Sequence, residues 1–508
     1  MKAMKPGKVR WARLSQVLFL AVFLVLFVQT EYRGSDRISL AVNSFFRADP
    51  LVAFSYLLAA KSFTLLLVPG LLLALFTLLL GRFFCGWICP LGTILDLVTA
   101  RIKKTAPLRF LRGNVKYWLL FPILFAALFN VNLAGLLDPI AILLRAATFT
   151  LYPIFGDTVR QGWAGLYRVI GEGRDGLAPA YALVRDHLLP FRETFYPLAF
   201  FSLLLLAFII FLERYETRSW CRRLCPLGTL LGILGRFSPF RRVPDRLCPD
   251  CGDCAQLCPT SFDRELLQRD ECIRCMSCTL RCRFKRAGFA LARPGPGSPC
   301  QPERRVLLGG LLSGFLLARL FRFRSPDAGA RLLRPPGVRE EKEFLKKCVR
   351  CGECMKVCLR SALYPAMFQA GAEGVYTPVL IPRLGYCEYN CTLCGQVCPT
   401  GAIPDLPAEE KKRQVIGKAV IDRNHCLPYA RGIDCLVCEE HCPIPHKAIR
   451  AETGKVTGPD GRVLELRKPY VVDELCNGCG ICEHVCPLEG RSAIQVFAVK
   501  DRTPLAED

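Results

Sequence analysis

The stretch from Cys248 to Cys282 constrains what this chain can fold into more than any other. It holds two runs of the form C-x2-C-x2-C-x3-C. At this spacing, three thiolates of a run bind one [4Fe-4S] cube and the fourth binds the neighbouring cube. We therefore expect one cube on Cys248, Cys251, Cys254 and Cys282, and another on Cys272, Cys275, Cys278 and Cys258. A structural zinc site or a disulfide framework fits poorly, because zinc pairs lack the third and fourth cysteines and disulfide frameworks belong to small secreted domains.

Cysteine usage extends this prediction to the second half of the chain. Of 29 cysteines, 24 form six groups of four, four form two C-x3-C-P pairs, and Cys300 stands alone. The four groups of the second half are Cys348, Cys351, Cys354, Cys358; Cys387, Cys391, Cys394, Cys398; Cys426, Cys435, Cys438, Cys442; and Cys476, Cys479, Cys482, Cys486. Short strand-like segments such as 420–422 and 471–473 flank them, which predicts repeated α+β ferredoxin-like units holding four more cubes. The spacing leaves open whether fourth cysteines are exchanged between adjacent groups or in a nested order.

Length and composition indicate several domains, one of them in lipid. The chain has 508 residues, 52% of them hydrophobic, and a mean hydropathy of +0.27. A formal charge of +24 would suit a nucleic-acid-binding protein. However, each cube with its four thiolates carries about −2, and most remaining Lys and Arg flank apolar segments. We find no nucleic-acid motif and expect no nucleic-acid partner.

The first 240 residues predict an α-helical membrane domain of four or five spans. The four expected spans are residues 14–28, 62–80, 117–133 and 195–212. Basic residues before the first span and after the second place those ends in the cytoplasm, so 31–50 and 135–194 become outer loops. Within the second loop, 137–155 is apolar enough to dip into the membrane, but Asp138 and Arg145 argue against a full crossing. The run 51–80 is too long for one span, so its first third is expected at the interface.

An internal repeat stands at the inner ends of the second and fourth spans. Arg82-Phe-Phe-Cys85-Gly-Trp-Ile-Cys89-Pro-Leu-Gly-Thr93 matches Arg218-Ser-Trp-Cys221-Arg-Arg-Leu-Cys225-Pro-Leu-Gly-Thr229. Positions i and i+4 share a helix face, so each copy is expected to present two thiols on one side. Together Cys85, Cys89, Cys221 and Cys225 predict a seventh cluster, or another metal or dithiol site. The alternative is four reduced thiols in a packed helix corner.

A Pro/Gly-rich linker separates the two cysteine-rich parts. It leads to Arg304-Arg305 and a short apolar run to Ala318, the pattern of a twin-arginine export signal. Export suits a domain that must cross the membrane already folded around its clusters. Arginines beyond the run, and its length of sixteen residues, favour the alternative of a cytoplasmic hairpin or helix. The expected domains are 1–240, membrane; 241–290, two-cluster ferredoxin; 291–340, linker; and 341–508, four-cluster ferredoxin.

With these motifs in place, the first half resembles the NapH type of membrane ferredoxin, which is related to NosR. The segment 304–508 resembles the NapG/MauM type of exported four-cluster ferredoxin, including the Cys426-x8-Cys435 spacing. The chain thus looks like a fusion of the two. The resemblance implies quinol oxidation at the membrane, a periplasmic cytochrome or reductase as partner, and nested pairing of the last four groups. Arg283 and Leu359 stand where the families carry a proline.

These patterns predict an iron–sulfur electron conduit in the bacterial inner membrane. Its expected cofactors are six [4Fe-4S] clusters with a candidate seventh centre, and quinone is its expected substrate. The first ferredoxin domain would be cytoplasmic and the last periplasmic. C-x2-C-H, glycine-rich dinucleotide and P-loop motifs are absent. Asp138, Arg145, His187 and Lys61 are ionisable groups near the membrane, but none is assigned a catalytic role.

Two other functions remain open at this point. One is an electron-donating maturation or regulatory factor for a metalloenzyme. The other is a subunit of a membrane oxidoreductase with other membrane redox subunits as partners and all clusters cytoplasmic.

Overall fold

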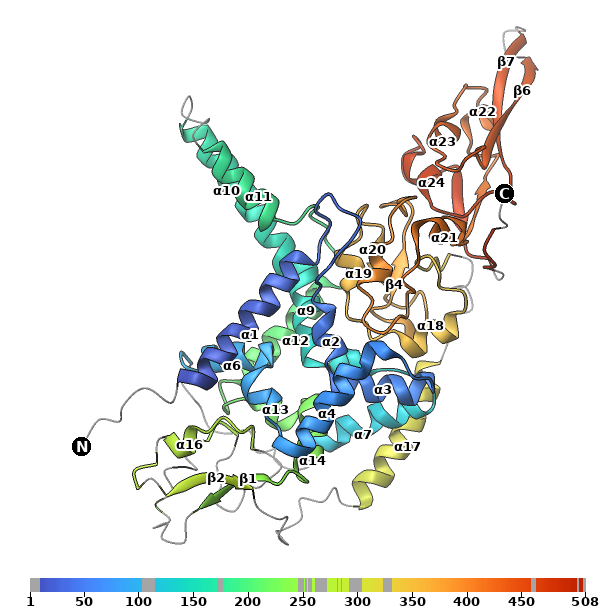
Figure 1. Cartoon of the computed structure of the whole chain (residues 1–508). Coiled ribbons are helices and arrows are strands. Elements are labelled where there is room, and N and C mark those ends of the chain that lie inside the picture. The colour runs from blue at the N-terminus through green and yellow to red at the C-terminus, as the bar shows by residue number, and fades with distance from the viewer. Residues whose placement is uncertain are drawn as a thin grey trace. The chain divides into compact units, whose positions relative to one another are not determined.

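The contacts of the chain divide it into two compact units (Figure 1). The structure, a computed structural model, describes residues 10–102, 115–170, 177–244, 251, 254, 258–260, 272–280, 282–284, 286–291, 304–322, 331–457, 463–499 and 502–505. Unit 1 comprises residues 1–29, 40–150 and 199–320, and unit 2 comprises 30–39, 151–198 and 321–508. The membrane domain expected at 1–240 is therefore not one unit. Two of its segments, 30–39 and 151–198, pack with the C-terminal part.

Unit 1 is mainly helical, with one two-stranded sheet. Its helices are α1 (Arg10–Gln29), α2 (Asn43–Arg47), α3 (Pro50–Ala60), η1 (Leu65–Leu67), α4 (Val68–Leu80), α5 (Phe84–Trp87), α6 (Pro90–Thr99), α7 (Val115–Leu128), α8 (Ala134–Leu137), α9 (Pro139–Ala146), η3 (Ala147–Leu151), α12 (Ala199–Leu212), α13 (Ser219–Arg223), α14 (Pro226–Gly235), α16 (Ser277–Leu280) and α17 (Arg304–Phe321). Strands β1 (Phe240–Pro244) and β2 (Ala287–Leu291) pair antiparallel. The apolar run 51–80 breaks as expected, because Lys61 ends α3 with a left-handed φ of 52°.

The predicted number of membrane spans is wrong. Among the described residues, two helical stretches are long and apolar enough to cross a membrane, Trp11–Gln29 and Pro139–Val169. The helices at the other three expected spans have 10–17 residues. At 1.5 Å per residue, the 14 residues of α7 reach only about 21 Å of the ~30 Å hydrocarbon layer. The second stretch lies where Asp138 and Arg145 argued against a crossing. Both side chains, like most of this stretch, are buried inside the protein, as in the core helix of a folded domain.

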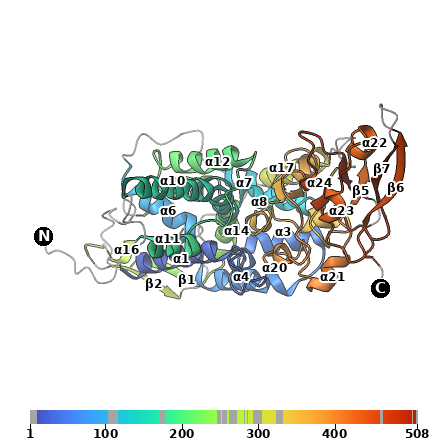
Figure 2. The ribbon, with the colours of Figure 1, turned by 90° about the horizontal axis from the view of Figure 1, so that it is seen from above.

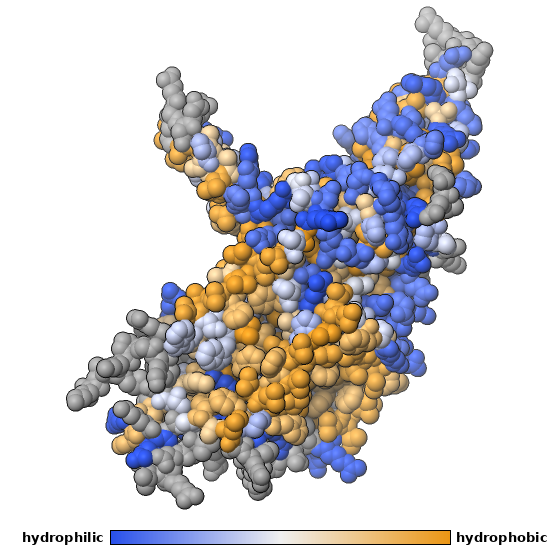
Figure 3. Space-filling model, viewed as in Figure 1, coloured by the Kyte–Doolittle hydropathy of each residue, from blue (hydrophilic) through white to orange (hydrophobic). Residues whose placement is uncertain are grey.

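The helices of unit 1 nonetheless carry a broad apolar surface. Figure 3 shows apolar side chains over much of the face of this unit that the view presents. On α4, Leu72, Leu75, Phe76 and Leu79 are each about half exposed, and α12 carries a similar row of exposed Phe and Leu side chains. Soluble proteins rarely expose apolar patches of this extent, so this surface suits burial against lipid or against another protein.

Unit 2 joins a helical hairpin to small α+β elements. Its helices are α10 (Tyr152–Ile170), α11 (Ala178–His187), α18 (Glu341–Lys347), α19 (Glu353–Lys356), η5 (Ala372–Gly374), α20 (Leu393–Gln396), α21 (Ala408–Arg413), α22 (Leu427–Ala430), α23 (Val437–Glu440) and α24 (Ile481–Val485). Its strands are β3 (Leu363–Pro365), β4 (Pro378–Leu380), β5 (Lys418–Ile421), β6 (Ile449–Thr457), β7 (Val463–Val471) and β8 (Ile494–Phe497). They form three two-stranded antiparallel sheets, β3–β4, β5–β8 and β6–β7, the last a long ribbon (Figures 1 and 2). The predicted strand segments are confirmed at Val420 in β5 and Val471 in β7.

Cysteines make up much of the buried interior of unit 2. One aliphatic cluster consists of only Leu332, Ala366, Ala370 and Val379, with Ile381 against it. Several predicted ligands, including Cys348, Cys351, Cys354 and Cys482, are less than 9% exposed. An interior built this way needs whatever the thiols bind to complete its packing.

Candidate metal centres

The structure gathers the first two cysteine groups of unit 2 into two sets of four. Burial raises the pKa of Cys354, and the thiols of Cys351, Cys348 and Cys398 raise it further. Burial likewise raises the pKa of Cys394, with added effects from Cys387, Cys391 and Cys358. We name these sets site C (Cys348, Cys351, Cys354 and Cys398) and site D (Cys387, Cys391, Cys394 and Cys358). Each site takes three cysteines from one group and the fourth from the adjacent group.

The last two groups of unit 2 follow the same rule. Burial raises the pKa of Cys426, as do the thiols of Cys435 and Cys486. Burial also raises the pKa of Cys476, and Cys442 adds to that shift. The two sets are site E (Cys426, Cys435, Cys438 and Cys486) and site F (Cys476, Cys479, Cys482 and Cys442).

The nested pairing implied by the family resemblance is therefore wrong. The physical reason is that a pair of antiparallel strands lies between the two cysteine groups that exchange a ligand. Strands β3 and β4 pair Leu363 with Leu380, which returns the chain from Cys358 toward Cys387. Strands β6 and β7 pair Ile449 with Val471 and do the same between Cys442 and Cys476. Closing these local hairpins costs less chain entropy than joining the first group to the last.

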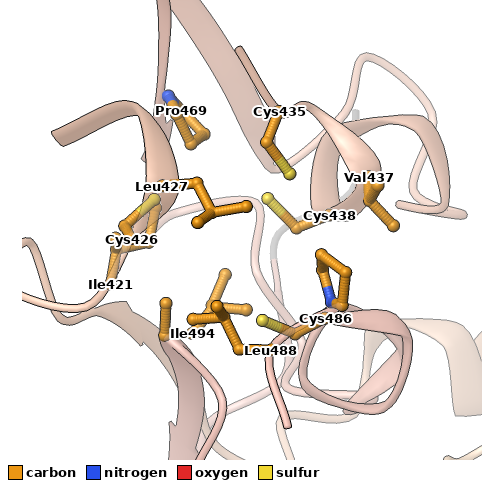
Figure 4. A pocket seen from close by; sticks show the side chains of 12 residues that line it. Ile421, Cys426, Leu427, Cys435, Val437, Cys438, Pro469, Cys486, Leu488 and Ile494 are labelled. Carbon is orange, nitrogen blue, oxygen red and sulfur yellow. The ribbon is translucent and has the colours of Figure 1, made fainter. Parts of the chain in front are cut away.

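Sites D and E each surround an apolar cavity. Figure 4 shows the site E cavity, with Cys426, Cys435, Cys438 and Cys486 around it among Ile, Leu, Val and Pro side chains. The four cysteines of site D line a second cavity. The two cavities are similar in volume, about 30 Å3 each. Within the described residues, no three His, Cys, Asp or Glu side chains converge as ligands of a single metal ion. Four thiols around an apolar space of this kind fit a [4Fe-4S] cube.

The sites of unit 2 contact one another in a line. The backbone N–H of Cys387, in site D, donates to the carbonyl of Cys479, in site F, at 2.9 Å. Sites C and D each take their fourth cysteine from the other site's sequence group, and sites E and F do the same. Burial raises the pKa of Cys482, and Cys438 of site E contributes to that shift. The order of contact is therefore C, D, F, E.

In unit 1 the two C-x3-C-P pairs also come together, as site A (Cys85, Cys89, Cys221 and Cys225). All four side chains are less than 9% exposed. The expectation that each pair lies on one helix face is wrong. Cys85 lies in α5, whereas Cys89 has an extended ψ of 117° and precedes α6. Cys225 precedes α14 with a ψ of 114°. The proline after each of these cysteines disfavours helical backbone at the residue before it, so the helix must break there.

Two arginines cross between the repeats and fix site A. Arg82 of the first repeat donates to the carbonyl of Cys221 at 2.9 Å. Arg218 of the second repeat donates to the carbonyl of Cys85. Each crossing needs a glycine: a Cβ on Gly228 would lie 2.6 Å from Arg82 Nη2, and one on Gly92 would lie 3.3 Å from Arg218 Nη1. The sequence carries the signal, Arg three residues before the first cysteine of both repeats, but its role became visible only in the structure.

The two-cluster ferredoxin segment also belongs to unit 1. Burial raises the pKa of Cys275, with added effects from Cys272 and Cys258. Cys278 responds to the same thiols, so the structure brings together site B (Cys272, Cys275, Cys278 and Cys258) as the spacing predicts. Of the remaining set, Cys248 lies outside the described residues. Cys254 Sγ accepts from Arg242 at 3.1 Å, and Cys282 Sγ accepts from the backbone N–H of Arg286 at 3.3 Å. Cys251 is exposed.

The ionisable candidates near the membrane have structural contacts. Asp138 caps α9, accepting from Ala141 N at 2.8 Å, and Arg145 donates to the carbonyls of Gly135 and Leu136. Asp138 is also fully buried beside Asp49, the cap of α3, a pairing that the sequence reasoning missed. Both precede a proline at a helix start, which was the available signal. Lys61 ends α3, and the carbonyl of His187 accepts from Arg33.

Comparison with known proteins places these features in a family. A family described as "4Fe-4S binding domain" matches residues 62–109 and 195–244, which contain the four cysteines of site A. The ferredoxin-type protein MauM of Paracoccus denitrificans is 38% identical over 189 residues, 37% of this chain and 80% of that protein. NapG of Escherichia coli is 36% identical over 193 residues, covering 37% and 80%. The chain belongs to the MauM/NapG family of ferredoxin-type proteins.

A second relative covers more of the chain. The ferredoxin-type protein NapH of Haemophilus influenzae is 28% identical over 302 residues, which are 54% of this chain and 86% of that protein. No solved structure matches the chain. This MauM/NapG-type protein is thus an iron–sulfur electron-transfer protein with several [4Fe-4S] sites, and it has a NapH-like portion.

Proposed function

We propose that this chain is a membrane-bound fusion of NapH-like and NapG-like ferredoxins that carries electrons from a quinol to a redox partner on the outer side of the inner membrane. Its ligands would be the four cysteines of each of sites A to F and the set Cys248, Cys251, Cys254 and Cys282. Bound [4Fe-4S] cubes would supply reversible one-electron transfer at each site. The polypeptide would hold the sites of each unit close together and bury most of their cysteines from water.

The observation that carries this proposal is which segments of the chain pack together in unit 2. Residues 30–39 and 151–198, which the charge pattern assigns to outer loops, pack with the four-site segment 341–508. Lys356, beside site C, donates to the carbonyl of Thr30 at 2.9 Å and lies 3.4 Å from Glu31. Tyr196 donates to the carbonyl of Met355 at 3.2 Å. These buried contacts support a periplasmic position for sites C to F.

Site B, in contrast, packs with segments that the charge pattern assigns to the cytoplasmic side. Its segment packs within unit 1, against residues 80–87, which precede the basic stretch that the positive-inside rule keeps in the cytoplasm. A cytoplasmic position for site B and an outer position for sites C to F would require electrons to cross the membrane.

Helix α17 would connect the two ferredoxin segments and stay attached to the rest of the protein. It packs on α7 through Gly310 and Gly314, where a Cβ would lie 2.7 Å from Phe121 Cβ and 2.6 Å from Phe125 Cβ. Small residues spaced by four allow close helix packing in membranes. The twin-arginine-like segment would then serve as an uncleaved transport signal and as an additional membrane helix.

Topology tests this proposal directly. A compartment-sensitive reporter is placed after Arg286 and, separately, after Asp508, in cells with and without twin-arginine transport. We expect a cytoplasmic signal after Arg286, and a periplasmic signal after Asp508 only when the transport system is present. Two cytoplasmic signals would contradict the proposed route and favour a subunit with all clusters inside.

Quinol oxidation is tested separately. The purified chain, in detergent and without oxygen, is mixed with a reduced quinol, and cluster absorbance is recorded. We expect bleaching that depends on quinol concentration. Clusters that dithionite reduces but quinol does not would contradict the quinol assignment.

A further inference from the structure

The loop of site B lies directly on the first repeat of site A. Gly86 follows Cys85, and Ile273 follows Cys272. A Cβ on Gly86 would lie only 2.3 Å from the carbonyl oxygen of Ile273, so the two backbones are in contact. Trp87 Nε1 donates to the carbonyl of Arg274 at 3.0 Å and fixes the same loop. Ile273 is 2% exposed, so water is excluded between the two backbones.

The second repeat meets the same site in a different way. Arg222 and Arg223 occupy the positions that match Gly86 and Trp87. Both guanidinium groups contact Glu216, at 3.4 and 3.0 Å. The Cys258 thiol is among the charged groups that act on Arg222. Thus the first repeat contacts site B by backbone packing, whereas the arginines at the matching positions of the second repeat bind Glu216.

We propose that sites A and B form an electron-transfer junction, and that Gly86 is the residue that sets its width. The inference rests on the proposed function, in which the site A cysteines hold a redox centre. One electron leaves one site as the other gains it, with no bond formed and no proton transferred. The connection is short: the Cys85–Gly86 peptide touches the Ile273 peptide, and Cys272 is the next residue.

Because the two repeats differ at this position, only the first repeat can bring its backbone into contact with site B. A backbone can approach this closely only where a residue has no side chain, and the second repeat has arginine at that position. Electrons would therefore pass between sites A and B beside Cys85 rather than beside Cys221. Site B, rather than the set containing Cys248, would be the first ferredoxin site in contact with the membrane centre.

The test compares Gly86→Ala with Gly165→Ala in the full-length protein. Gly165 has nothing within 4 Å of an added Cβ, so it controls for adding a methyl group. Iron and acid-labile sulfide are measured first, to show that all centres are retained. Spin–spin interaction between reduced centres is then measured by electron paramagnetic resonance, and electron equilibration by rapid mixing. Gly86→Ala is expected to weaken the interaction and slow equilibration several-fold, while Gly165→Ala matches the wild type.

Two further variants separate the possible failures. Trp87→Phe removes the hydrogen bond to Arg274 and keeps an aromatic ring, and it is expected to act in the same direction, which covers the case that Gly86→Ala does not fold. Full iron content with an unchanged interaction in both variants would overturn the junction. A Cys85→Ser/Cys221→Ser double variant with wild-type iron and spectra would show that site A holds no redox centre. That result would refute the underlying assignment as well.

Discussion

The two arginines that cross at site A, Arg82 and Arg218, allow a quantitative prediction. They occupy equivalent positions of the repeat, but the side chains around them differ. The Arg218 side chain is 1% exposed and ion-pairs with Asp96 at 2.7 Å. Its Nε donates to the other carboxylate oxygen of Asp96 at 2.8 Å. The position in the second repeat that matches Asp96 is Gly232, so the carboxylate that pairs with Arg218 is not repeated at that position. Both arginines satisfy one backbone carbonyl of the opposite repeat.

The cost of replacing each arginine by methionine follows from these partners. Arg82→Met leaves the buried carbonyl of Cys221 without this donor, a loss of about 1–3 kcal/mol in the free energy of unfolding. Arg218→Met does the same at Cys85 and also breaks a largely buried ion pair, which raises the loss to about 3–5 kcal/mol. We expect the pair with Asp96 to account for about 2 kcal/mol of the loss in Arg218→Met.

The assay is denaturant unfolding of the purified protein in detergent under anaerobic conditions, followed by circular dichroism. Asp96→Asn completes a double-mutant cycle with Arg218→Met, and the cycle isolates the pair. A coupling energy near zero between Arg218 and Asp96 would refute the reasoning.

Three further predictions concern other parts of the chain. Gly228→Ala should lower iron bound at site A, measured as iron per chain, because its Cβ would meet Arg82 Nη2 at 2.6 Å; retained iron would contradict the crossing geometry. Cys398→Ala should remove the cluster spectrum of site C while sites D to F persist, and loss of site D instead would contradict adjacent exchange. Burial, and then Asp138, raise the pKa of Asp49, so the stability of unit 1 should fall as pH rises above about 4, and fall less in Asp49→Asn; equal pH profiles in thermal melts would contradict a shared proton.

The sequence predicted the three cysteines that each group gives to one site, because these three ligands lie within 7 to 13 residues of one another in the chain. The fourth ligand depended on long-range structure. Cys358 reaches site D, and Cys442 reaches site F, only because a β-hairpin in each exchange returns the chain. No spacing rule within a single group contains that information.

Helix lengths were harder to predict than helix positions. Apolar helices occur at all four expected places, but α4 and α12 begin later than expected and α7 ends earlier. Apolar composition does not report where a helix stops, and the boundaries here are set by Lys61, by the left-handed Asn130 after α7 and by the proline that follows each second cysteine of the repeats. The buried partners of Arg145 and Asp138 could not be predicted from the sequence either, because they are backbone groups brought close by the fold.

The repeat shows how a duplicated motif acquires direction. Features that hold site A together are present twice: the arginine, the two cysteines, the proline and the glycine. Features that differ, Gly86 against Arg222 and Asp96 against Gly232, lie on the side where site B docks or where one crossing arginine is anchored. A symmetric pair of repeats can hold one centre between them, but a single ferredoxin segment can pack its backbone on only one repeat. An electron path that leaves site A beside only one repeat requires such differences, and they occur at positions where the two repeats have different residues.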